Sequence, residues 1–103
     1  MNKDFKPYYA VIFTSTQKEN VEGYAEMAAR MEELAKQQPG YLGIDSARNE
    51  VGITVSYWES LDAIKNWKKQ SEHLAAQLKG RQDWYRWYNV RICKVEREYE
   101  FNS

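Results

Sequence analysis

Cysteine and histidine are scarce in this chain of 103 residues, which has one of each. The single cysteine, Cys93, cannot form a disulfide within the chain, so the sequence excludes a disulfide-stapled secreted domain. Its place in an apolar pattern predicts a small buried residue. Structural zinc sites are built mainly from cysteine and histidine ligands, which are lacking here. We therefore expect no metal site, and the reducing cytoplasm as the compartment.

Charge of one sign and long apolar runs are also missing. Fifteen basic and fifteen acidic residues cancel and are interleaved, so no field favours a polyanion such as nucleic acid. No apolar run approaches the roughly 18 residues that would span a bilayer. The first residues, MNKDFKPYY, lack the charged-then-apolar run of a secretory signal. We expect a protein that binds neither nucleic acid nor a membrane.

Aromatic residues, in contrast, are abundant: they make up 15% of the sequence, and apolar residues make up 43%. The tryptophans are Trp58, Trp67, Trp84 and Trp87, and there are eight tyrosines. The length fits one domain, residues 1–103 with a core over about residues 8–100, and a domain of this size buries only about two-thirds of its chain's surface. So much ring surface must pack in a core, line a pocket or meet a partner.

The first half of the chain predicts a strand, a helix and a hairpin. Residues 8–16, YYAVIFTST, are rich in β-branched and aromatic residues and predict a buried strand. Asn20 can cap a helix whose apolar residues recur at spacings of three and four, and a Pro-Gly pair at Gly40 ends it. Residues 41–47 and 51–58 are short apolar runs separated by RNE, which predicts adjacent antiparallel strands.

The second half predicts a helix in two pieces and a long strand. Ser60 can cap the first piece, and its apolar stripe breaks over residues 68–71. Ser71 can start a second piece that runs to about residue 83. Residues 87–101 alternate in two phases that exchange near Ile92, which predicts either a bulge there or a change in which face of the strand is covered.

These elements follow the order β-α-β-β-α-β, which predicts an α+β fold, a ferredoxin-like sandwich with a split second helix. Helices on one face of a four-stranded sheet leave the other face uncovered, and both faces of the first strand are apolar. Tyr9, Val11 and Phe13 lie on one side, and Tyr8, Ala10 and Ile12 on the other. A second copy of the sheet is the simplest cover, so we expect a two-fold homodimer.

Several segments resemble a known family in their order and spacing. They are QPGYLG, GITVSYWESLDAIKNWKK, EHLAAQLKGR and the tyrosine-rich stretch that runs into VRICKVEREY. Together they resemble the antibiotic biosynthesis monooxygenase domain over about residues 8–100. The resemblance implies that the homodimer is a dimeric α+β barrel with a pocket between helices and sheet in each subunit. Its superfamily includes cofactor-free monooxygenases of aromatic polyketides and haem-degrading enzymes, so the fold alone does not fix the chemistry.

The resemblance implies a pocket lined by five residues: Trp67, His73, Arg81, Trp84 and Tyr88. Helical spacing adds Gln77, which shares an edge with His73 and Arg81 if the helix is unbroken to about residue 83. The expected substrate-binding residues are therefore Trp67, Gln77, Trp84 and Tyr88.

His73 and Arg81 are the candidate catalytic residues. A histidine can accept and return a proton near neutral pH, as removal of a proton from a quinol or an anthrone-like carbon requires. Arg81 could hold the resulting oxyanion while it reacts with dioxygen. These roles predict a monooxygenase that needs no cofactor and oxidises a small planar aromatic. The simpler alternative is that His73 is a polar residue on the surface of a helix.

Two other functions stay open. The haem-degrading branch uses an Asn in the first strand, a Trp in the second helix and a His ten residues later. Trp67 matches the Trp, but Gln77 stands at the His position and the first strand has no Asn, so His73 would have to reach a haem iron from another angle. The third function is a dimer that binds a small metabolite without chemistry. Whichever function holds, Trp67 completes an apolar stripe that favours a place in the core, and the rings around Trp84 suit either a pocket wall or a dimer interface.

Overall fold

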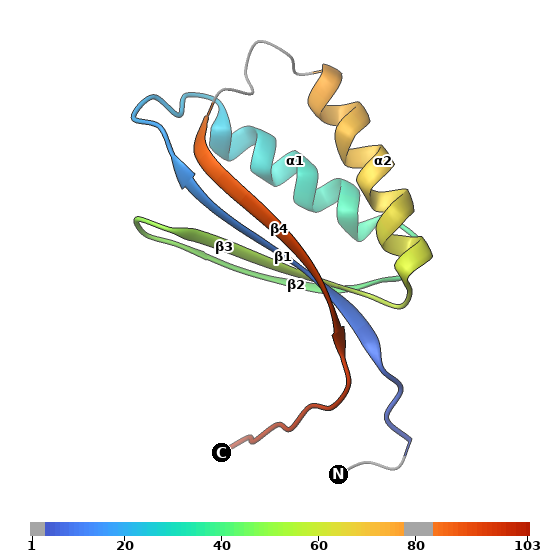
Figure 1. The fold of residues 1–103 in the computed structure, drawn as a ribbon. Coiled ribbons are helices and arrows are strands. Elements are labelled where there is room, and N and C mark those ends of the chain that lie inside the picture. Colours follow the sequence, from blue (N-terminus) through green and yellow to red (C-terminus); the bar gives the residue numbers. More distant parts are fainter. Residues whose placement is uncertain (1–3, 78–83) are drawn as a thin grey trace.

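The computed structural model of the chain describes residues 4–77 and 84–103. Its helices and strands follow in the order β1 (Tyr8–Gln17), α1 (Tyr24–Lys36), β2 (Tyr41–Arg48), β3 (Gly52–Trp58), α2 (Leu61–Gln77) and β4 (Tyr85–Val95). The strands form one antiparallel sheet in the order β2-β3-β1-β4, and both helices lie on one face of it (Figure 1). The predicted α+β fold with ferredoxin-like order is confirmed.

Strand β1 lies inside the sheet, and its side chains alternate between the two faces. Tyr9 and Val11 point to the helices and pack against the core. Ala10 and Ile12 therefore point to the face that carries no helix. This alternation, which the sequence predicted, gives the sheet a helix-side face and an outer face, and both are partly apolar.

The core joins β3 to both helices. Trp58, the last residue of β3, is fully buried, and its Nε1 donates a hydrogen bond to Ser56 Oγ at 2.8 Å. An indole N–H buried without an acceptor would cost free energy, so Ser56 permits a tryptophan at this position. Ala35 of α1 and Ala63 of α2 belong to the same buried cluster, and their small side chains let both helices lie close to the ring.

Helix α1 begins later than predicted. Its N-cap is Gly23, in a left-handed conformation with φ 85°. Asn20 lies upstream in a separate turn, where its Oδ1 accepts a hydrogen bond from the Glu22 backbone N at 3.2 Å. The prediction that Asn20 caps the helix is wrong, because the chain turns once more at Gly23, a conformation that glycine adopts without strain. At the other end, Gly40 with φ 83° leads into β2 after the helix has ended.

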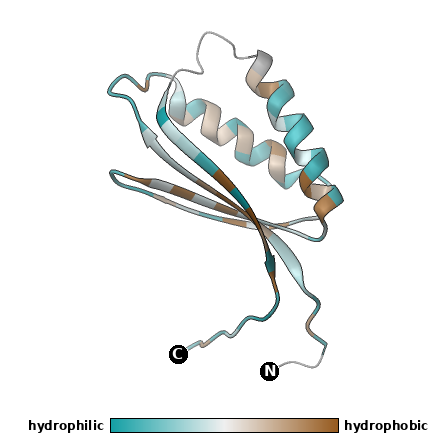
Figure 2. Cartoon of the chain, viewed as in Figure 1, coloured by the Kyte–Doolittle hydropathy of each residue, from teal (hydrophilic) through white to brown (hydrophobic). Residues whose placement is uncertain are grey.

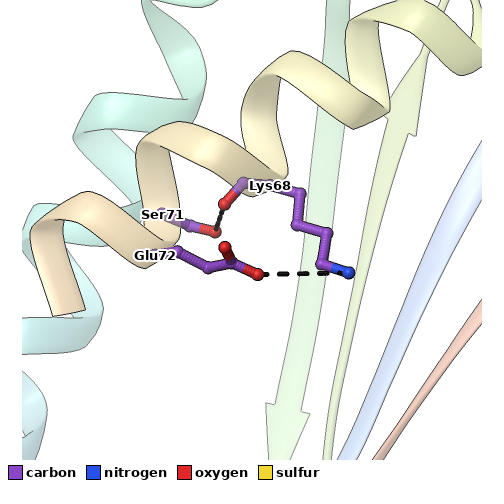
Figure 3. A network of polar contacts seen from close by, with 3 residues as sticks. All are labelled: Lys68, Ser71 and Glu72. Carbon is purple, nitrogen blue, oxygen red and sulfur yellow. Dashed lines mark hydrogen bonds and ion pairs between the residues drawn. The ribbon is translucent and has the colours of Figure 1, made fainter. Parts of the chain in front are cut away.

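Helix α2 is continuous over residues 61–77, so the predicted split is wrong. Ser60 is the predicted cap, and its Oγ accepts a backbone N–H of the first turn at 3.0 Å. At the expected break, the Ser71 hydroxyl donates a hydrogen bond to the Lys68 carbonyl oxygen at 2.9 Å (Figure 3). The serine hydroxyl therefore finds its acceptor within the helix and does not interrupt it. Lys68 also pairs with Glu72 at 4.0 Å along the exposed surface.

Neither of the two described helices is long and apolar enough to cross a membrane.

Strand β4 ends at Val95, earlier than predicted. Val95 pairs with Tyr8, the first residue of β1, so the following residues have no neighbouring strand to bond. The register shift of this pairing leaves out Arg86 at the other end of the strand. Pairing is regular around Ile92, so of the two predicted explanations for the change of phase there, the bulge is wrong. Cys93 lies on the outer face and is exposed, because no helix covers that face, so the prediction of a buried cysteine is wrong as well.

Replacing Gly40 by Ala should lower the free energy of unfolding by about 2 kcal/mol, because the left-handed backbone disfavours a side chain and the packing is tight. A Cβ at Gly40 would lie 2.7 Å from the Ala63 Cβ. Gly43→Ala is the matched control, since a Cβ there would lie at an ordinary 3.7 Å from Tyr57. Urea denaturation measures both. Equal stability of the two variants would contradict this account of Gly40.

Candidate functional site

The ring residues on the helix-side face fall into two groups at opposite ends of the sheet. The first group belongs to the core. Trp67 of α2 stacks on Trp58 with ring centroids 5.8 Å apart and planes at 20°, and Tyr41 meets Trp58 edge on at 5.7 Å. Trp67, one of the expected substrate-binding residues, is thus half-buried against the core, as the simpler alternative for this residue had it.

The second group, which we call the aromatic cluster, consists of Phe13, Tyr24, Trp84, Tyr85 and Tyr88. Phe13 of β1 stacks on Tyr88 of β4, with centroids 5.4 Å apart and planes at 22°. Tyr85 meets Phe13 edge on at 5.5 Å and Tyr24 at 5.7 Å. The cluster therefore connects β1 and β4 to the first residue of α1.

Trp84 fixes the start of α1 to the start of β4. It is buried, and its ring lies edge on to Tyr24 at 5.8 Å. Its Nε1 donates to the Glu22 carbonyl oxygen at 2.9 Å, and its own carbonyl accepts the Lys18 backbone N–H at 2.7 Å. Trp84 thus supports the aromatic cluster from within the chain. Tyr88, which is 59% exposed, is the ring of the cluster that solvent reaches most.

Burial raises the pKa of Tyr85, because an ionised phenol would lose its hydration there. The hydrogen bond that Tyr85 Oη donates to Tyr24 Oη, at 3.3 Å, raises this pKa further. The positive charge of Arg48 acts in the opposite direction without overcoming these causes. Tyr85 is therefore protonated at neutral pH, and it can donate a hydrogen bond but cannot serve as a base.

Arg48 brings a positive charge to the aromatic cluster. The strand register places Arg48, Gly52 and Ser15 in one row across β2, β3 and β1. The Arg48 side chain crosses over Gly52, and its Nη2 donates a hydrogen bond to Ser15 Oγ. A Cβ at Gly52 would overlap the guanidinium, so a glycine is needed under this path. The Tyr24 ring lies against the guanidinium, with its centroid 5.6 Å from Arg48 Cζ.

The aromatic cluster is exposed along β4. Tyr88, Val90 and Ile92 follow one another on the helix-side face of this strand, and Val90 and Ile92 are 48% and 53% exposed. Figure 2 shows hydrophobic residues alternating with hydrophilic ones along part of β4. A flat apolar ligand can therefore approach Phe13 and Tyr88 from this edge of the sheet.

The remaining predicted site residues belong to α2 and to the segment after it. His73 is exposed on α2, next to Leu74, which is buried. Gln77 is the last residue of α2, and only its backbone is described. Arg81 lies outside the described residues. Within residues 4–77 and 84–103, no group of three His, Cys, Asp or Glu side chains is placed to hold a metal ion.

The structure separates the rings that the sequence had grouped: Trp84 and Tyr88 lie in the aromatic cluster, and Trp67 in the core group. Sequence reasoning did not single out Arg48, the charged residue of the site. The predicted hairpin gave no signal for it, because that hairpin placed Arg48 in its loop, at residues 48–50. In the structure the loop is residues 49–51, which sets Arg48 at the end of β2 opposite Gly52. A glycine opposite a long side chain leaves room for that side chain to lie across the neighbouring strand.

Proteins of similar sequence or structure provide independent findings. The sequence matches the family model of antibiotic biosynthesis monooxygenase over residues 7–79. It is 55% identical over 99 residues to the uncharacterized protein YqjZ of Bacillus subtilis (strain 168), a match that covers 94% of this chain and 87% of YqjZ.

Solved structures with the same fold include SnoaB, a cofactor-independent oxygenase from Streptomyces nogalater. It matches with a TM-score of 0.69 and 11% identity, over 95% of this chain and 100% of SnoaB. PA3566 from Pseudomonas aeruginosa matches with a TM-score of 0.67 and 16% identity, over 91% of this chain and 97% of that one. At these identities the two structures show a shared fold and nothing further.

Stability should fall as the pH rises above about 10, the ordinary pKa of an unfolded tyrosine, because the folded chain favours the protonated form of Tyr85. Tyr85→Phe should make this fall shallower when urea midpoints are compared between about pH 8 and pH 11. Part of the fall in stability will remain in this variant, because hydrogen bonds to Glu98 and Asp45 raise the pKa of Tyr8 and Tyr57 as well. Tyr99→Phe, at an exposed tyrosine, is the control. A Tyr85→Phe slope equal to that of wild type would contradict the shift.

Proposed function

Because the chain belongs to the antibiotic biosynthesis monooxygenase family, we propose that it is a cofactor-free monooxygenase of a small planar aromatic substrate, a quinol or an anthrone-like compound. One observation carries this proposal: the aromatic cluster is exposed along β4 at Tyr88, with the charge of Arg48 beside it. Flat ligands suit aromatic walls with a few polar groups. SnoaB, a cofactor-independent oxygenase with the same fold, supports the proposal.

The proposed reaction needs a base and a group that stabilises an anion. The base removes a proton from the ring CH₂ of an anthrone, and the carbanion, delocalised onto the ketone oxygen, forms a C–O bond with dioxygen. Protonation gives a hydroperoxide. Loss of the second C–H proton then breaks the O–O bond, releases water and leaves a carbonyl group. One dioxygen is consumed for each ketone and water formed, so the balance needs no external reductant.

We propose His73 as the base and Arg81 as the group that holds the oxyanion. His73 is exposed on α2, as both this role and the simpler alternative of a polar surface residue allow, so the choice between them rests on the oxygen-uptake assay below. The proposed substrate-binding residues are Trp67, Gln77, Trp84 and Tyr88. Tyr88 has the strongest support, since it stacks on Phe13 and still exposes more than half of its surface.

No contact among residues 4–77 and 84–103 favours haem chemistry. The residues do not fit the arrangement of the haem-degrading branch, because β1 carries no Asn and the one histidine of the chain, His73, is exposed on α2. A dimer that binds a metabolite without turnover would use the same aromatic cluster. It would give a thermal shift with a ligand but no oxygen uptake, which separates it from the proposed enzyme.

We propose further that two copies pair through the outer face of the sheet as a dimeric α+β barrel. Ile12, Ile53, Val55 and Trp87 share that face, and Ile53 and Trp87 are 45% and 49% exposed in the single chain. Apolar surface of this extent is better placed in an interface than in water, and a second sheet is a self-complementary cover. The proposed compartment is the cytoplasm, where the exposed Cys93 thiol stays reduced.

His73→Ala should lower the rate of oxygen uptake with an anthrone by about 100-fold or more, because general base catalysis contributes at least that much. An oxygen electrode and the absorbance of the quinone product measure the rate. Lys65→Ala, at another exposed residue of α2, is the control and should leave the rate unchanged. Uptake at the wild-type rate in His73→Ala would remove this residue from the mechanism.

Ile53→Glu should convert the proposed dimer to monomers, because a carboxylate on the outer face would be buried without a partner. Light scattering after gel filtration measures the mass. Leu61→Glu changes another exposed apolar residue, at the start of α2, and should leave the dimer intact. Wild-type protein with the mass of a single chain would disprove the dimer.

A further inference from the structure

Arg48 is held in place by three elements of the sheet and one helix. Its side chain leaves β2, crosses over Gly52 of β3 and donates a hydrogen bond to Ser15 of β1. Ser15 is fully buried, so its hydroxyl has a fixed place in the sheet. Tyr24 of α1 lies against the guanidinium at 5.6 Å. A long arginine side chain that is positioned in this way loses less entropy when it binds a ligand.

The charge of Arg48 is not neutralised within the described part of the chain. Across residues 4–77 and 84–103, the recorded ion pairs are Lys36 with Glu32 and Lys68 with Glu72, and the recorded hydrogen bond of Arg48 goes to the neutral Ser15 hydroxyl. A guanidinium has several N–H donors in a planar fork. A single hydrogen bond to Ser15 leaves the remaining N–H groups of Arg48 to bind a second acceptor. The fork geometry matches a ligand oxygen that carries negative charge.

The aromatic cluster lies beside this charge. Tyr24 contacts both the guanidinium and Tyr85, and Tyr85 contacts Phe13 and Tyr88. A planar ligand at the exposed rings along β4 would therefore have a cation near one end and aromatic carbon along its length. This arrangement favours a ligand with the complementary design, namely a ring system with an anionic oxygen on one edge.

We propose that Arg48 binds the anionic oxygen of the incoming substrate, in addition to Arg81 at the developing oxyanion, and that the substrate class is a planar aromatic that carries an ionised oxygen, a phenolate, enolate or carboxylate. This inference deepens the proposed function and rests on it for the location of the substrate. Gly52 and Ser15 act as positioning residues, because they hold the guanidinium in its place without reaching the ligand.

Binding of 2-naphthoate and of its neutral analogue 2-naphthamide, measured by calorimetry at neutral pH, tests the proposal without any turnover. The wild-type chain should bind naphthoate about 10-fold more tightly, since a charge-assisted hydrogen bond is stronger than a neutral one. Arg48→Gln should remove this preference and leave the affinity for naphthamide unchanged. Arg30→Gln, at an exposed arginine of α1, is the control and should keep the preference.

Gly52→Ala provides a second variant that alters no charge. The added Cβ would displace the guanidinium from its path to Ser15, so the preference for naphthoate should weaken while naphthamide binding persists. A purely structural Arg48 would change stability in both variants without changing the ratio of the two affinities. A preference that survives in Arg48→Gln, or a wild-type chain that shows none, overturns the proposal.

The outcome is separable from that of the oxygenation assay. A chain that prefers naphthoate through Arg48 but takes up no oxygen with quinols or anthrones would keep the anion site and lose the proposed reaction. A chain that takes up oxygen with the same rate in Arg48→Gln, and shows no preference between the two naphthalenes, would keep the reaction and lose the anion site.

Discussion

The position of β1 between β3 and β4 is the constraint on which the rest of the structure depends. Because β1 pairs on both edges, its register fixes which side chains of β1, β3 and β4 share a face, and the pairing of β2 with β3 extends this to all four strands. Tyr9 and Val11 then meet the helices, and Ile12 is left on the outer face. The same register sets Ser15 in line with Arg48, so the core, the outer face and the candidate site all follow from one alignment of strands.

On the helix-side face, the two ends of the sheet differ in how deeply their aromatic residues are buried. At one end Trp58 fills the space between the sheet and both helices, and its buried N–H is satisfied by Ser56. At the other end Trp84 ties the start of α1 to β4, but the rings beyond it remain accessible. The buried core cluster lies at the first end, whereas Tyr88 at the second end is exposed.

The reaction proposed for this chain requires three features of the protein: a base, a cation for the developing oxyanion and a surface that fits a flat ring. In the described structure, the stacked rings of the aromatic cluster lie beside the Arg48 guanidinium, and we assign them to binding the ring and the anionic oxygen of a substrate, with His73 as base and Arg81 at the oxyanion. Since dioxygen brings its own oxidising power, the remaining task is to select and orient the substrate anion. The proposed site of Arg48 and stacked rings is suited to that task, because it offers a cation beside a flat aromatic surface.

The sequence by itself determined the features that depend on neighbours along the chain: the alternation of β1, the hairpin of β2 and β3, the Ser60 cap and the family. It also predicted that both sheet faces are apolar. Tertiary structure alone decided that α2 continues through Ser71, that β4 ends where β1 begins, and that Trp67 and Tyr88 belong to different groups. The physical reason is that these outcomes depend on partners far away in sequence. The Arg48 contact with Ser15 is the clearest case, because it exists only when three strands are aligned side by side.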